Sequence, residues 1–142
     1  MPSVAPERPK ERSDQSSKAI SLLIVEDDAL VASYIRDVLE ESGFVVLGTP
    51  STGAEALALA GALRPRLALV DIRLAGPLDG IEVACELLSR YEVPSIFLSG
   101  VVDPEVLERA RAAQPLGFLP KPFRPSQVFN ALEEALKRPL PS

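Results

Sequence analysis

The sequence contains no histidine, and its only cysteine is Cys85. Without histidine, the chain has no imidazole base for a catalytic triad, no imidazole ligand for zinc and no histidine that carries a phosphoryl group. A single cysteine excludes a disulfide within the chain and fits a reducing compartment. These absences exclude acyl transfer by a Ser-His or Cys-His pair and metal sites built from cysteine and histidine.

Long apolar runs and an excess of positive charge are also missing. No segment approaches the ~20 apolar residues that span a bilayer, and residues 1–18 lack the apolar stretch of a signal peptide. The chain carries 15 basic against 20 acidic side chains, a net charge of −5, whereas nucleic-acid phosphates bind basic surfaces. We therefore expect a cytoplasmic protein that neither inserts into a membrane nor binds nucleic acid directly.

The chain does have enough apolar material for one domain. It has 142 residues, 46% of them hydrophobic, which is the usual size of a single domain with its own core. Residues 1–18 are rich in proline, serine and charge, a composition that predicts a disordered tail. Residues 139–142 form a second, short tail. We expect the folded domain over residues 19–138.

Hydrophobic periodicity alternates along this domain between two patterns. Short, nearly continuous apolar runs are typical of buried strands, whereas apolar residues three and four positions apart predict amphipathic helices. The expected strands are residues 20–25, 44–47, 67–70, 94–98 and 116–119. The expected helices are residues 28–42, 52–63, 80–91, 104–113 and 126–137. Strands that alternate with helices predict a parallel sheet covered on both faces, with the functional crevice beyond the carboxyl ends of the strands.

Polar side chains follow four of these strands. Three acids occupy positions 26–28 after the first strand, Asp71 follows the third, Ser99 the fourth and Lys121 the fifth. In the strand order 2-1-3-4-5 all of them would meet in one crevice. Clustered carboxylates require a cation, and hard oxygen ligands suit Mg²⁺, while a lysine holds a phosphate oxygen. With the serine hydroxyl, these groups are suited to moving a phosphoryl group onto an aspartate.

The same residues form four sequence motifs. In chain order they are residues 24–28 (IVEDD), 70–74 (VDIRL) with 79–80 (DG), 97–100 (FLSG) and 117–123 (GFLPKPF). With these motifs, residues 19–137 resemble the receiver domain of two-component response regulators. The resemblance implies an α/β fold, a flavodoxin-like doubly wound (βα)5 sandwich whose parallel sheet has the strand order 2-1-3-4-5.

The resemblance also implies a phosphoacceptor and a metal site. Asp71 corresponds to the aspartate that takes a phosphoryl group from a phosphohistidine on a sensor histidine kinase or a histidine phosphotransfer protein. Asp27 and Asp71 correspond to direct Mg²⁺ ligands, and Glu26 to a residue that acts through water. The backbone carbonyl of Arg73 completes the ligands that the protein supplies.

A second group of residues corresponds to the switch of the family. Ser99 resembles the switch hydroxyl, Phe118 the switch aromatic, and Lys121 the lysine that binds the phosphoryl group, with a bond to Pro122 that is often cis. Because Lys121 follows a strand end, we expect its ammonium to be solvated and to contribute little to stability. Two features depart from the family pattern: Pro120 before the lysine is uncommon, and the loop at residues 75–78 is slightly long.

Simpler interpretations stay open for several of these residues. The acids at positions 26–28 can serve only to stabilise the N-terminus of the following helix, which favours negative charge. Asp71 can be a residue that caps a loop. Ser99 precedes a glycine, as in an ordinary turn. Lys121 can be a solvated loop residue, and Phe118, in an apolar strand, can be a core residue only.

Two other functions compete with the phospho-accepting receiver. A phosphatase of the haloacid dehalogenase type needs a second acid two residues after the nucleophile, where this chain has Arg73, which cannot exchange protons. A degenerate receiver would be only a protein-binding module, yet Asp27, Asp71 and Lys121 are all present. We expect a single-domain signalling protein rather than an enzyme. It would act on an unknown target by docking or phosphorelay. The face of the fourth helix, fifth strand and fifth helix is a candidate dimer surface.

Overall fold

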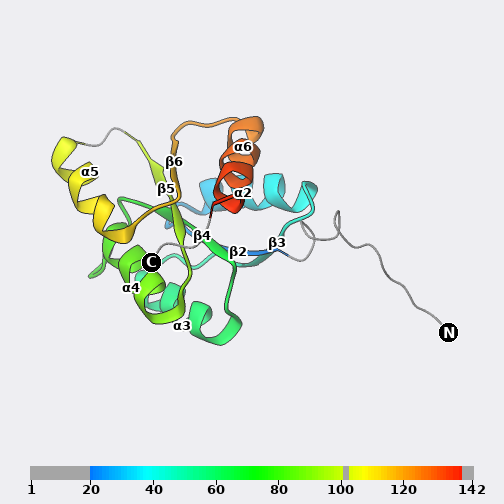
Figure 1. The fold of residues 1–142 in the computed structure, drawn as a ribbon. Coiled ribbons are helices and arrows are strands. Elements are labelled where there is room, and N and C mark those ends of the chain that lie inside the picture. Colours follow the sequence, from blue (N-terminus) through cyan, green and yellow to red (C-terminus); the bar gives the residue numbers. More distant parts are fainter. Residues whose placement is uncertain (1–19, 101–102, 139–142) are drawn as a thin grey trace.

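The strands form one parallel sheet. The computed structural model describes residues 20–100 and 103–138, so the expected tails at 1–18 and 139–142 lie outside the described residues. The strands are β2 (Ser21–Val25), β3 (Val45–Gly48), β4 (Leu67–Asp71), β5 (Ser95–Ser99) and β6 (Gly117–Pro120). Their order across the sheet is β3-β2-β4-β5-β6, and every neighbouring pair is parallel. The predicted order 2-1-3-4-5 is confirmed (Figure 1).

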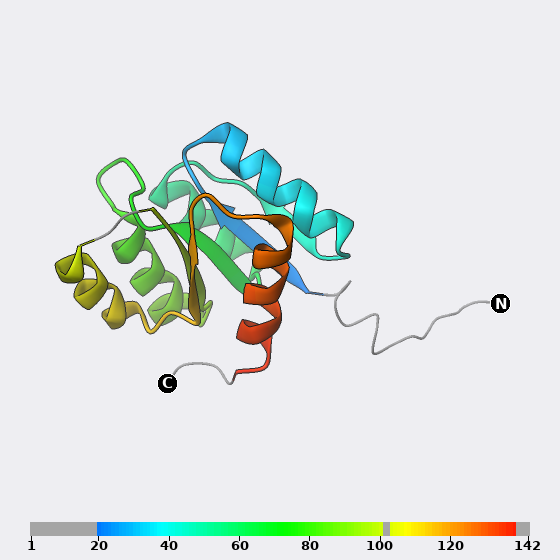
Figure 2. The ribbon, with the colours of Figure 1, turned by 90° about the horizontal axis from the view of Figure 1, so that it is seen from above.

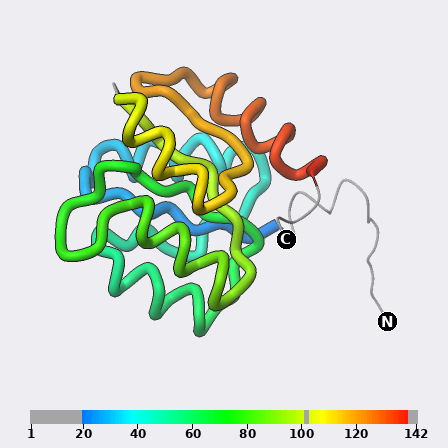
Figure 3. Tube along the Cα trace, turned by 60° about the vertical axis from the view of Figure 1, so that its left-hand side comes forward, coloured from blue at the N-terminus to red at the C-terminus, as the bar shows by residue number. Residues whose placement is uncertain are grey.

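Helices cover both faces of this sheet. They are α2 (Ala29–Glu41), α3 (Gly53–Leu63), α4 (Gly80–Tyr91), α5 (Pro104–Ala110), the 3-10 turn η1 (Arg111–Ala113) and α6 (Pro125–Leu136). α2 and α6 pack on one face, and α3, α4 and η1 pack on the other (Figure 2). Figure 3 shows α3 and α4 side by side, across the blue β2 strand from α6. No helix of the described residues is long and apolar enough to cross a membrane.

The two layers explain the continuous apolar runs of the strands. In β2, Leu22 and Ile24 join the cluster under α2 and α6, whereas Leu23 and Val25 join the cluster under α3 and α4. Successive side chains of a strand point to opposite faces, so a strand covered on both faces needs an apolar residue at every position. All four residues are fully buried. The continuous apolar runs that predict the strands therefore also predict a sheet covered by helices on both faces.

Most helix and strand ends lie within one or two residues of the predicted ones, and the differences have local causes. Asp28 caps α2 from outside the helix, because its carboxylate accepts hydrogen bonds from the next amides. Pro94 precedes β5 instead of opening it. Pro120 closes β6, which lies at the edge of the sheet, where a residue without an N–H is tolerated. The fourth predicted helix becomes a 3-10 turn at Arg111.

Candidate functional site

Three carboxylates converge at the carboxyl ends of two central strands. Glu26 and Asp27 directly follow β2, and Asp71 ends its neighbour β4. One oxygen from each of the three side chains can be chosen so that all lie within 4.8 Å of one another. Glu26 and Asp71 are buried, whereas Asp27 is exposed. The cluster therefore combines two carboxylates set into the protein with one that faces solvent.

Backbone amides fix the orientation of these carboxylates. Glu26 accepts a hydrogen bond from the amide of Asp28 at 3.0 Å, and Asp71 accepts one from the amide of Arg73 at 3.0 Å. Asp27 accepts from the amide of Ala75 at 3.2 Å, across 48 residues of sequence. Such bonds hold a carboxylate in place before any ligand arrives. The third acid of the run, Asp28, is the α2 cap, so the simpler interpretation holds for that residue.

Lys121 reaches into the cluster from the edge of the sheet. Its Nζ lies 2.9 Å from Glu26 Oε1 and 3.5 Å from Asp71 Oδ2. Only 27% of its side chain is exposed, and 1% of that of Glu26. The expectation that the Lys121 ammonium is solvated therefore holds only in part, because the side chain is paired with carboxylates but is not fully buried. A strand end on the rim of the sheet still allows a long side chain to lie inward, where the carboxylates replace water as its partners.

This pairing changes the proton affinity of both groups. Burial raises the pKa of Glu26, the hydrogen bonds from Lys121 and the Asp28 amide oppose that rise, and the charge of Asp71 adds to it. Burial alone would lower the pKa of Lys121, but its hydrogen bond to Glu26 and the charges of Asp71 and Glu26 outweigh it, so the pKa is raised. Lys121 is therefore a permanent cation beside two acids at neutral pH.

Ser99 ends β5 between the acids and the lysine strand. It is buried, and its carbonyl accepts a hydrogen bond from the Lys121 amide at 2.6 Å. Phe118 lies on the next strand, β6, and is 41% exposed. Its ring centroid lies 5.8 Å from that of the fully buried Phe97. The interpretation of Phe118 as a core residue only is wrong, because one side of its ring is open to solvent.

The loop after Asp71 is held close to the sheet at both ends. The amide of Ile72 donates to Leu98 of β5 at 3.0 Å. Gly80, the first residue of α4, packs so tightly that a Cβ there would overlap the carbonyl oxygen of Asp71. Within the loop, Gly76 has a φ of 111°, a conformation that glycine adopts without strain. The Lys121–Pro122 peptide bond, on the other side of the site, is cis, as the resemblance implies.

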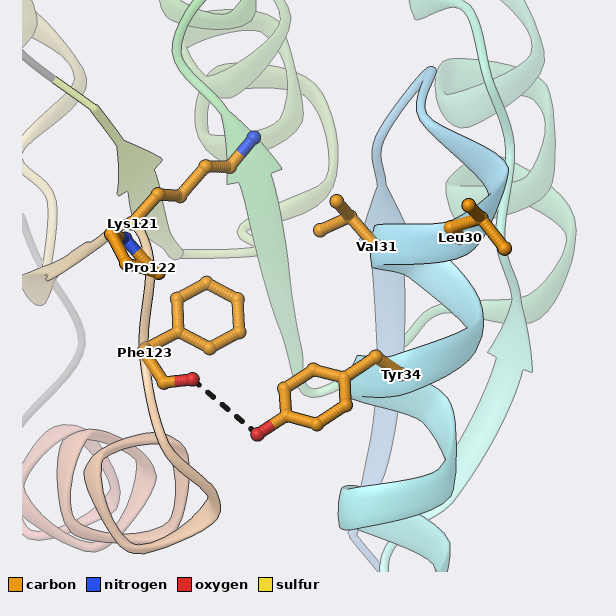
Figure 4. Close-up of a pocket in the computed structure, with 6 residues that line it drawn as sticks. All are labelled: Leu30, Val31, Tyr34, Lys121, Pro122 and Phe123. Atoms are coloured by element: carbon orange, nitrogen blue, oxygen red, sulfur yellow. Dashed lines mark hydrogen bonds between the residues drawn. The ribbon is translucent and has the colours of Figure 1, made fainter.

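An apolar pocket that the sequence did not reveal borders the site. α2 contributes Leu30, Val31 and Tyr34, and the loop after β6 contributes residues 121–123 (Figure 4). Its volume is about 430 Å³. The Tyr34 hydroxyl donates to the carbonyl of Phe123 at 3.3 Å, and the two rings stack at 6.0 Å. Leu30 is 83% exposed, although in the sequence it fits the apolar stripe of a helix.

Curated proteins with similar sequences are regulators. The chain is 34% identical to the transcriptional regulatory protein PdtaR of Mycobacterium tuberculosis over 117 residues, which cover 82% of this chain and 57% of that protein. It is 34% identical to the phyllosphere-induced regulator PhyR of Methylorubrum extorquens over 119 residues, which cover 83% of this chain and 44% of that protein. The chain thus spans about half the length of the curated relatives it matches.

Solved receiver domains share both fold and length. The signal receiver domain of a modulated diguanylate cyclase from Desulfovibrio desulfuricans is similar with a TM-score of 0.78 and 41% identity, covering 82% of this chain and 93% of that one. A CheY-like receiver protein from Methanospirillum hungatei gives a TM-score of 0.76 at 26% identity, covering 83% and 94%. The family model described as response regulator receiver domain matches residues 22–133. The chain belongs to the response regulator receiver domain family.

Proposed function

We propose that this receiver, over residues 19–138, takes a phosphoryl group onto Asp71 from a phosphohistidine of a partner protein. The observation that carries the proposal is the convergence of Glu26, Asp27, Asp71 and Lys121 at the carboxyl edge of the sheet. Three acids alone would repel an anionic donor, but the ammonium of Lys121 lies 3.5 Å from Asp71. The site therefore has both a nucleophilic oxygen and a cation beside it.

The carboxylates fit Mg²⁺. Ligand oxygens of one octahedral Mg²⁺ lie about 3–4 Å apart, because each is roughly 2.1 Å from the ion. The chosen oxygens of Glu26, Asp27 and Asp71 lie within 4.8 Å of one another, so small side-chain movements would let two of them bind one ion directly and the third through a water. When bound, the ion neutralises charge on the acids and on the transferred group. Asp27 and Asp71 would hold it directly, Glu26 through water, and Arg73 through its backbone carbonyl.

In the transfer itself, one bond replaces another on phosphorus. A carboxylate oxygen of Asp71 forms the new P–O bond as the P–N bond to the donor histidine breaks. The imidazole leaves with the bonding electron pair and, after taking a proton, is the neutral histidine of the partner. The phosphoryl group adds about −1.5 to −2 charges, which Lys121 partly offsets. The protein supplies positioning and charge, in line with a signalling domain rather than a classical enzyme.

The pocket beside Lys121 is our candidate for the contact with the phosphodonor protein. A donor histidine must come within bonding distance of Asp71, so the donor protein has to cover the rim of the crevice. Leu30, Pro122 and Phe123 form an apolar part of that rim (Figure 4), and burying apolar surface there would favour binding of a protein. We therefore propose that a histidine kinase or phosphotransfer protein docks on α2 and the loop after β6.

The change that follows phosphorylation would occur on the side of Lys121 that lies away from the apolar pocket. Ser99 is the hydroxyl on the strand beside Asp71, and the exposed Phe118 is on the next strand. We propose that Ser99 and Lys121 move to the phosphoryl oxygens and shift the packing of Phe118. The face of α5, β6 and α6, where Phe118 and Leu107 are exposed, would then bind a downstream protein or a second copy.

The test is the intact mass of the protein after incubation with acetyl phosphate and Mg²⁺. The wild type should gain one phosphoryl group, and Asp71→Asn should gain none. Asp37→Asn, which removes an exposed carboxylate of α2, should behave as the wild type. A wild type that gains no phosphoryl group under these conditions, or an Asp71→Asn variant that still gains one, contradicts the proposal.

A further inference from the structure

A second cavity lies at the end of the sheet away from the carboxylates. Ile20, directly before β2, and Arg66, directly before β4, are among its lining residues. These strands carry Glu26 and Asp71 at their other ends, and a five-residue strand spans about 17 Å. The cavity has a volume of about 470 Å³, within the range of small-molecule sites, which is roughly 300–1,000 Å³.

Arg66 has an unmet requirement for a hydrogen-bond acceptor. Its Nη1 atom is buried and has no hydrogen-bond partner within the described part of the chain. The backbone of Arg66 is fixed, because its amide donates to the carbonyl of Ser21 at 2.8 Å. Buried polar atoms are nearly always paired, and a buried charged donor without an acceptor is costly. Because Arg66 lines the cavity, an acceptor that enters it, together with a small turn of the guanidinium toward the cavity, would meet this requirement.

The rest of the lining is apolar with a charged rim. Phe44 is buried and Phe129 half-buried, and both belong to or pack against the core under α2 and α6. Lys137 and Glu133 of the C-terminal helix region are exposed at the cavity. Among the described residues, no ion pair joins Arg66 to Glu133. The cavity therefore has two positive groups, one negative group and two aromatic walls.

We propose that this cavity binds a small monocarboxylate with an aromatic or aliphatic body. The guanidinium of Arg66 matches the geometry of a carboxylate, and the body of the ligand would lie against Phe44 and Phe129. A single negative charge balances the one excess positive charge that Arg66, Lys137 and Glu133 leave in the lining, whereas a phosphate dianion would exceed it. The site is separate from the carboxylate cluster, so the proposal does not depend on phosphorylation of Asp71.

The experiment compares the binding of a carboxylic acid and of an uncharged alcohol of the same shape to the full-length protein. Amide NMR spectra are recorded during titration with 3-phenylpropionate and with 3-phenylpropan-1-ol, which share one aromatic body. The acid should give saturable shifts at the lining residues Ser42, Phe44 and Arg66, with a dissociation constant in the millimolar range or below, at least about tenfold tighter than the alcohol. Equal affinity for acid and alcohol, or no saturable shift with the acid, overturns the proposal and indicates a hydrated groove only.

Two variants then test whether Arg66 is the group that binds the carboxylate. Arg66→Gln should bind the acid as weakly as the alcohol, and Arg90→Gln, which removes an exposed guanidinium of α4, should bind it as the wild type does. The amide spectrum shows whether Arg66→Gln is folded. If it is not, the acid and alcohol titrations of the wild type still decide the proposal. A folded Arg66→Gln that keeps the affinity of the wild type for the acid contradicts it.

Discussion

Lys121 and Glu26 form a 2.9 Å ion pair between the ends of β6 and β2, and the Glu26 side chain is 1% exposed. The two strands are not neighbours, since β4 and β5 lie between them. The lysine therefore crosses the whole carboxyl edge of the site to reach its partner. This pair ties the edge strand to the strand that carries the acids, and it gives the resting site a cation of its own.

Lys121→Ala should lower the free energy of unfolding by about 1–3 kcal/mol at pH 7.5, because it leaves the buried Glu26 carboxylate without its charged partner. The pKa of Glu26 is already raised in the folded protein by burial. A carboxyl group whose folded pKa is raised costs stability as the pH rises through the region between its unfolded and folded pKa values. The deficit of the variant should therefore shrink at pH 4.5, where Glu26 takes up a proton.

Urea denaturation at both pH values measures this effect. Lys137→Ala is the matched control, because Lys137 is exposed and forms no ion pair within the described residues. Adding Glu26→Gln to Lys121→Ala should recover part of the loss, since an uncharged amide then replaces the unpaired carboxylate. Equal stability of Lys121→Ala and the wild type at pH 7.5 would show that water replaces the ammonium at little cost.

Gly80→Ala should be destabilising by about 1–3 kcal/mol, the usual cost of overpacking a closely packed site. The added Cβ would overlap the carbonyl oxygen of Asp71, and neither the helix start nor the strand end can move freely. Gly117→Ala is the control, because a Cβ there meets no atom of the described residues within 4 Å. Thermal melts should separate the two variants, and similar melting temperatures would contradict the close packing.

The sequence predicts the three inner strands well because β2, β4 and β5 are buried on both faces, whereas the order of the strands is implied by the resemblance to receiver domains. A short continuous apolar run such as residues 67–70 favours a strand between two helical layers, and Asp71 follows it at the functional edge. The position of Lys121 is different. Its neighbours in the sequence are two prolines, and nothing in that pattern shows that its side chain turns inward to meet Glu26.

Phe118 and Leu30 show a second limit. Both are apolar residues at positions where a pattern predicts burial, and both are exposed. Phe118 lies on β6, the edge strand, which is only partly buried, and Leu30 lies in the first turn of α2. Coverage of such positions is a property of packing between distant segments, which local periodicity does not encode.

Mg²⁺ should raise the melting temperature of the unphosphorylated protein. A ligand that binds only the folded state stabilises it by mass action, and the ion would relieve repulsion among Glu26, Asp27 and Asp71. Asp27→Ala should abolish most of the shift, whereas Asp37→Ala should leave it unchanged. Melts with and without millimolar MgCl₂ provide the measurement. The same shift in Asp27→Ala and the wild type would place the ion elsewhere.

Cys85 should react slowly with iodoacetamide at pH 8. Burial raises the pKa of its thiol, and the charges of Glu86 and Asp79 add to the rise, so a smaller fraction is present as the reactive thiolate. Unfolding in urea removes these effects and should speed the reaction several-fold. The rate is followed by intact mass. A folded protein that reacts as fast as the unfolded one would show that helix α4 leaves the thiol open to solvent.

Ser99→Ala should separate acceptance of the phosphoryl group from the response to it. The Ser99 hydroxyl is neither the phosphoacceptor nor one of the acids proposed to hold Mg²⁺, so the variant should still be modified by acetyl phosphate. Its amide spectrum should change less than that of the wild type when beryllofluoride, which mimics an aspartyl phosphate, is added. The reduction should be greatest at residues 117–119, because β6 pairs with the strand that Ser99 ends. Ser89→Ala, an exposed serine of α4, is the control. If Ser99→Ala responds around Phe118 as fully as the wild type does, the signal reaches the edge strand through Lys121 alone, and Ser99 has no part in the switch.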